Sequence, residues 1–127
     1  MRTAKLTING TEHLLCFSAR VIRSISERYG DMDKMGKALE QKDQCKALDE
    51  CFWVLSTMMD AGARYAAHEG LDNPPPLTVD ELLDLCDIAD FAGLKGKIFE
   101  TVTAGKTTTV EADAPKNAGA AREKKSG

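Results

Sequence analysis

The sequence predicts an α+β fold in which an N-terminal β-hairpin is followed by a mainly α-helical bundle. Three observations predict it: an Asn-Gly turn between two apolar-alternating segments, helical spacing of apolar residues in four later segments, and a C-terminal change in composition. The chain of 127 residues is suited to one domain, which we expect over residues 1–103. Residues 104–127 hold one large aliphatic residue among Ala, Gly, Thr and Lys, so we expect a disordered tail there.

The hairpin is predicted over residues 3–17. Apolar residues alternate with polar ones on both sides of Asn9-Gly10. This dipeptide favours a type I′ turn, because both central positions of that turn need a positive φ. A lone hairpin is only marginally stable in water, so we expect the next helix, at residues 18–29, to cover its apolar face.

Four helices are predicted from apolar spacing and from residues suited to helix ends. Their approximate ranges are 18–29, 43–69, 79–89 and 91–103. Ser18 is a natural N-cap, and Thr78 with Glu81 forms a capping box. Gly30 is a natural stop for the first helix. Between the first two helices, a short helical turn is a further expectation, with apolar positions at Met32, Met35 and Leu39.

Composition and charge exclude several classes of protein. The net charge of −3 and the pI near 5.4 disfavour a general nucleic-acid binder, which normally carries a strong basic field. No apolar run is long enough to span a bilayer, and no apolar leader stands at the N-terminus. We therefore expect a cytoplasmic protein that binds neither nucleic acid nor membrane, with its cysteines reduced.

No metal, cofactor or catalytic site is predicted. The four cysteines form no C-x-x-C pair and the two histidines are far apart in the sequence. Gly105 and Lys106 resemble the end of a phosphate-binding loop, but Glu100 stands where that loop needs a glycine. No nucleophile with a base and an orienting group can be assembled, so we expect a protein that is not an enzyme. Three cysteines in apolar surroundings are expected in the core: Cys16, Cys51 and Cys86.

Binding is the function that remains, and the helix at residues 43–69 is its best candidate. At about 100° per residue, Trp53 falls opposite the main apolar stripe, among polar residues. It either meets a second layer of the same fold or meets another protein. Methionine side chains adapt to irregular partners, although a place in the core is the favoured interpretation for Met58 and Met59. The candidate partner-binding residues are Phe52, Trp53, Met58, Met59 and Tyr65.

Four segments occur in an order typical of one family. They are LTINGTEHLLCFS at 6–18, VIRSISERYG at 21–30, the long apolar helix over 47–69, and LTVDELL at 77–83. This order resembles the tail assembly chaperones of long-tailed bacteriophages and related prophages. The resemblance covers about residues 3–103, while residues 31–44 and the triple proline have no counterpart in the pattern.

The resemblance implies a role and two partners. Such chaperones bind the tape measure protein, keep it soluble, and leave as the tail tube polymerises around it. A longer product made by frameshifting often recruits the tail tube protein, and Lys124-Lys125 can be encoded by a slippery adenine run. The resemblance implies no catalytic residue and no cofactor.

Two other functions stay open at this point. One is a structural tail component, such as a connector or completion protein. The other is a small adaptor or regulator that uses Arg20, Arg23 and Arg28 on the first helix. The oligomeric state also stays open, and a homo-oligomer could pair through the open edge of the hairpin.

Overall fold

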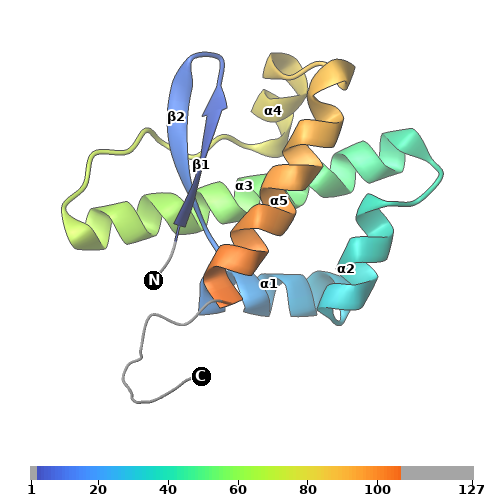
Figure 1. Cartoon of the computed structure of the whole chain (residues 1–127), viewed down its shortest axis with the longest axis horizontal. Coiled ribbons are helices and arrows are strands. Elements are labelled where there is room, and N and C mark those ends of the chain that lie inside the picture. Colours follow the sequence, from blue (N-terminus) through green and yellow to red (C-terminus); the bar gives the residue numbers. More distant parts are fainter. Residues whose placement is uncertain (1–2, 107–127) are drawn as a thin grey trace, which may run out of the picture.

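The structure is a computed structural model that describes residues 3–106. It confirms the α+β class, with an antiparallel hairpin followed by helices (Figure 1). The predicted disordered tail lies outside the described residues, except for residues 104–106, which are helical. The elements are β1 (Thr3–Ile8), β2 (Thr11–Cys16), α1 (Ala19–Tyr29), α2 (Met32–Leu39), α3 (Gln44–Glu69), α4 (Val79–Leu85), the 3-10 turn η1 (Ile88–Asp90) and α5 (Phe91–Lys106).

The hairpin forms as its turn chemistry predicts. Asn9 and Gly10 have φ values of 50° and 79°, as a type I′ turn requires. The register pairs Ile8 with Thr11 and Leu6 with His13. One face is therefore buried and the other is exposed. In the described part of the chain the sheet has two strands, so the outer edge of β1 has no strand partner.

Helix α3 is the centre of the fold. Strand β2 and helices α1, α2, α4 and α5 all pack against it (Figure 1). Because neighbours lie on several sides, its buried residues are spread around the helix and do not form a single stripe. They are Ala47, Cys51, Phe52, Val54, Leu55, Met58, Met59, Ala61, Gly62 and Ala66.

The hairpin is covered by α3 and α5, and the prediction that α1 covers it is wrong. Strand β2 crosses α3 at Gly62, where an added β-carbon would overlap the carbonyl group of Leu14. Helix α5 meets the chain just beyond β2, where a β-carbon at Gly105 would lie 2.5 Å from that of Phe17. Gly62 thus lets α3 approach β2, and Gly105 lets α5 approach Phe17, more closely than any side chain would allow.

Most helix ends follow the predicted signals. The Ser18 hydroxyl accepts the N–H of Val21, and Gly30 and Gly70 end α1 and α3 with φ values of 99° and 68°. Both hydrogen bonds of the Thr78 capping box are present.

Three helices differ from the prediction. Helix α2 is a full eight-residue helix, because Asp31 caps it by accepting the N–H of Lys34 at 2.8 Å. The helix predicted over 79–89 ends at Leu85, since Cys86 is extended and the Asp87 side chain accepts the N–H of Ala89 to begin η1. Helix α5 continues past residue 103 to Lys106.

The proline-rich connection between α3 and α4 is held in place by hydrogen bonds at two points. The Asn73 side chain accepts the N–H of Leu14 at 3.0 Å, on the outer edge of β2. The Ser56 hydroxyl of α3 donates to the carbonyl of Leu77 at 2.7 Å. The connection therefore occupies part of a strand edge and holds α4 against α3.

The cysteines fit a structural role. Cys16 and Cys51 are buried, as predicted, while Cys86 is half-buried against the core and Cys45 is exposed. Burial raises the pKa of the Cys51 thiol to about 12 and also raises the pKa of Cys16. A thiol held neutral in this way is a poor nucleophile, which fits its packing role.

His13 gives the fold a dependence on pH. Its side chain is buried and its Nδ1 atom has no hydrogen-bond partner. Burial lowers the pKa of His13 below its usual value of 6.5, because the charged imidazolium is desolvated. The unfolded chain therefore binds a proton more readily than the folded chain, and stability falls as the pH drops below about 6.5.

We expect His13→Leu to flatten this dependence. The free energy of unfolding, measured by urea denaturation from pH 5 to pH 7.5, should fall less steeply on acidification in the variant. A single group can change it by at most about 1.4 kcal/mol per pH unit. Parallel profiles for the two proteins would show that His13 does not set the acid sensitivity.

Candidate functional site between α1 and α3

The five predicted partner-binding residues divide into two groups. Phe52 is 1% exposed and Met58 and Met59 are fully buried, so all three belong to the core in this conformation. Their placement on a partner-binding surface is thus corrected, and the core interpretation of the two methionines is confirmed. Trp53 and Tyr65 are half-buried on α3 and lie beside α1.

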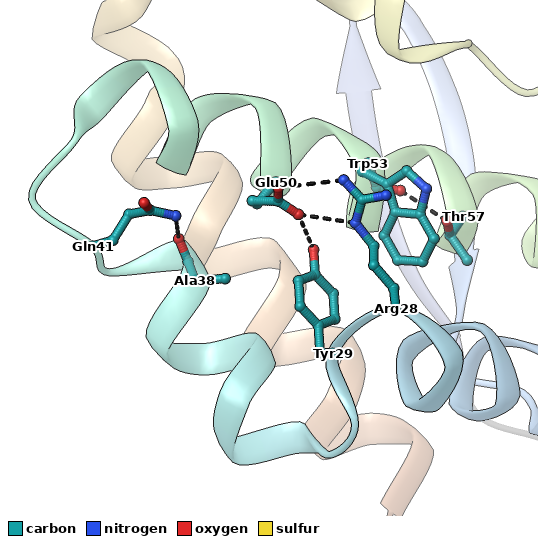
Figure 2. Close-up of polar contacts among 7 residues, drawn as sticks. All are labelled: Arg28, Tyr29, Ala38, Gln41, Glu50, Trp53 and Thr57. Carbon is teal, nitrogen blue, oxygen red and sulfur yellow. Dashed lines mark hydrogen bonds and ion pairs between the residues drawn. The ribbon is translucent and has the colours of Figure 1, made fainter.

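Trp53 does meet a second layer of the fold. The guanidinium carbon of Arg28 lies 4.5 Å from the centre of the Trp53 ring, and the Tyr29 ring meets Trp53 edge-on at 5.8 Å. Figure 2 shows that Glu50 joins these residues from α3. Its carboxylate accepts hydrogen bonds from Arg28 Nε at 2.9 Å and from the Tyr29 hydroxyl at 2.6 Å. The C-terminal end of α1 is thereby fixed to α3.

The charges in this cluster stabilise one another. Burial opposes ionisation of Glu50, but hydrogen bonds from Arg28 and Tyr29 outweigh it and lower the pKa of the carboxyl. The hydrogen bond to Glu50 raises the pKa of Arg28. Burial raises the pKa of Tyr29, and the hydrogen bond to the Glu50 carboxylate raises it further. The cluster is therefore a charged Arg–Glu pair with a neutral tyrosine at neutral pH.

We expect Glu50→Ala to lower the free energy of unfolding by about 1–2 kcal/mol, because Arg28 and Tyr29 lose their shared acceptor. Partial exposure of the pair limits the effect. Urea denaturation followed by circular dichroism measures it. The matched control is Asp60→Ala, which removes the more exposed i,i+4 pair with Arg64 and should cost about 0.3–0.5 kcal/mol. Equal losses in both variants would contradict a structural role for the cluster.

Beyond this cluster, two cavities follow the line between α1 and α3. The first, of about 400 Å³, lies beside Trp53 and is bounded by α1, α3 and the end of the proline-rich connection. The second, of about 320 Å³, lies beside Tyr65. Arg20 lines both cavities, and we call the two cavities together the α1/α3 groove. Its lining residues on the two helices are Ala19, Arg20, Ser24, Trp53, Ser56, Thr57, Asp60, Ala61, Arg64, Tyr65 and His68.

The groove has a mixed chemistry that suits binding. The second cavity has an apolar base of Ala61 and Tyr65, and its rim carries Arg20, Arg64 and His68.

Within residues 3–106, no group of His, Cys, Asp or Glu side chains is arranged to hold a metal ion. In the same part of the chain, no helix is both long and apolar enough to cross a membrane.

Sequence reasoning missed most of the groove. Arg20 and Ser24 are four residues apart on α1, and this spacing is the signal that could have identified one wall. The opposite wall on α3 could not be found in the same way, because it depends on where α1 crosses. Arg28, one of three arginines considered for an adaptor role, is held by Glu50 and Trp53.

Comparisons of the chain with models of protein families, with curated protein sequences and with solved structures gave no significant match.

Proposed function

We propose that the chain is a phage tail assembly chaperone, a non-enzymatic protein of the host cytoplasm. It binds the tape measure protein, keeps it soluble, and helps the tail tube polymerise around it. The sequence resemblance over residues 3–103 suggests this function.

One structural observation supports the proposal most strongly: the α1/α3 groove that holds Trp53 and Tyr65. An amphipathic helix binds by laying its apolar side into such a groove. The groove combines apolar and polar walls over several helical turns, which fits many moderate contacts. A chaperone needs contacts of this kind, because it must release its partner when the tube subunits arrive.

The first test is co-expression with the tape measure protein encoded near this gene. We expect that protein to be soluble only with the chain present, and to co-purify with it. A tape measure protein that stays insoluble in both conditions would contradict the chaperone function. Mass spectrometry of purified particles provides a second test, since a chaperone leaves and a structural tail component stays. Detecting the chain there at the level of tail proteins would overturn the proposal.

A second experiment addresses the tail tube protein. The gene, with its native downstream DNA and an N-terminal tag, should yield a minor longer product that continues past Lys125 in another reading frame. We propose that this extension recruits the tail tube protein. Lys124 and Lys125 lie outside the described residues, and mass spectrometry of the expressed products shows whether the longer product forms.

A further inference from the structure

The second cavity of the α1/α3 groove has the opposite charge to the domain that carries it, whereas the first cavity also contains Asp60. Residues 1–103 contain 12 Lys and Arg against 17 Asp and Glu, so the domain is acidic. Around the second cavity the charged or titratable side chains are Arg20, Arg64 and His68, and no described carboxylate lines it. A basic cavity on an acidic domain is a local feature that favours a partner with negative charge at that point.

The two arginines differ in how they are engaged. Arg64 Nε lies 2.8 Å from a carboxylate oxygen of Asp60 and is about half-exposed. Arg20 is exposed and forms no ion pair with any carboxylate in residues 3–106. Because Arg20 lines both cavities, a carboxylate placed between them can reach a free guanidinium. Guanidinium–carboxylate pairs are strong and directional, since two parallel hydrogen bonds can form.

The apolar parts of the groove lie at helical intervals. Trp53 stands beside the first cavity, Ala61 and Tyr65 form the base of the second, and Tyr65 is half-buried. From Trp53 to His68, α3 advances about 22 Å at about 1.5 Å per residue, which equals about four turns of a partner helix. The second cavity is at the lower limit for small-molecule sites, which suits inserted side chains better than a cofactor.

We propose that the α1/α3 groove binds an acidic amphipathic helix of a partner protein. An apolar side chain of that helix enters the cavity beside Tyr65, and flanking carboxylates pair with Arg20 and Arg64. A second apolar side chain, about three turns away, lies against Trp53. This inference rests on the proposed function and specifies the chemistry of the tape measure segment that is bound.

Two synthetic 18-residue helical peptides test the charge preference in the full chain. Both carry leucine at the same i, i+3, i+4, i+7 and i+11 positions and lack tryptophan. One has glutamate at the flanking positions and the other has lysine. Trp53 is the only tryptophan and lines the groove, so its fluorescence reports binding. We expect the glutamate peptide to bind at least about ten-fold more tightly, although the domain is acidic. Equal or tighter binding of the lysine peptide overturns the proposal.

Charge reversal then locates the site. The double variant Arg20→Glu with Arg64→Glu should invert the preference between the two peptides. The matched control is Arg23→Glu, an exposed position on the same helix that lines neither cavity, and it should keep the wild-type preference. Thermal melts confirm that each variant is folded. The proposal is overturned if the double variant keeps the preference or if Arg23→Glu inverts it. It is also overturned if duplex DNA, and not the glutamate peptide, changes the fluorescence in a salt-sensitive way.

The peptide and co-expression experiments separate this inference from the proposed function. Tight binding of the glutamate peptide without solubilisation of the tape measure protein supports the groove preference and rejects the assembly role. Solubilisation by the Arg20→Glu, Arg64→Glu variant at the wild-type level supports the assembly role and rejects the groove as its site.

Discussion

Replacing Gly62 with valine should cost about 3–5 kcal/mol of folding free energy. A β-carbon at this position would overlap the Leu14 carbonyl, so the added atoms meet the backbone of β2 and not the end of a flexible side chain. Neither element can move easily, because Leu15 and Met58 beside the contact are fully buried. Overpacking a core typically costs about 1–3 kcal/mol of folding free energy. A clash with the backbone should cost at least the upper value of this range.

Urea denaturation measured by circular dichroism tests this expectation, with Gly36→Ala as the matched control. Gly36 lies in helix α2, and an added β-carbon there has no atom within 4 Å. The control should stabilise the chain by about 0.5–1 kcal/mol, because alanine favours the helix and restricts the unfolded chain. If Gly62→Val were tolerated as well as Gly36→Ala, β2 could not cross α3 in the way described.

Local chemistry explains what the sequence predicted correctly. Asn9-Gly10, the N-cap Ser18, the terminal glycine Gly30 and the capping residue Thr78 each act within a few residues. Such signals can be recognised without knowing which elements touch. The end of α4 before Asp87, which the sequence prediction missed, also follows from a local signal. An Asp side chain commonly begins a new turn.

The cover of the hairpin could not be predicted in the same way. Helix α1 follows β2 directly, so adjacency in sequence favoured it, but β2 packs on α3 and β1 on α5. The contact depends on Gly62 meeting Leu14, 48 residues away, and the glycine alone does not indicate its partner. Long-range packing of this kind arises from the whole arrangement of elements and leaves little trace in local patterns.

The sequence predicted only part of the candidate site, because the site also depends on contacts between elements that are far apart in the sequence. Helical spacing correctly separated Trp53 from the main apolar stripe, but its partners Arg28 and Tyr29 belong to another helix. The sequence places Phe52 among the binding candidates because a groove for a partner helix needs an apolar lining. A helix with neighbours on several sides buries such residues, and the sequence does not show which sides will be covered.

The neighbouring residues Phe52 and Trp53 should respond very differently to alanine. Phe52 is 1% exposed in the core, so Phe52→Ala should cost about 3–5 kcal/mol through lost burial and the cavity it leaves. Trp53 is half-buried and contacts Arg28 and Tyr29. Trp53→Ala should cost about 1–2 kcal/mol, since part of its surface is already in water and the cation–π contact adds little at an exposed site.

Urea denaturation followed by circular dichroism measures both variants, because Trp53→Ala removes the fluorescent residue. A domain of this size is typically stable by about 5–15 kcal/mol, so Phe52→Ala can use most of that margin while Trp53→Ala leaves a folded chain. The folded Trp53→Ala chain can then be tested for solubilising the tape measure protein, where we expect a loss. A large loss of stability in Trp53→Ala with little loss in Phe52→Ala would mean that α3 is turned relative to its neighbours, and the groove would have to be sought on its other side.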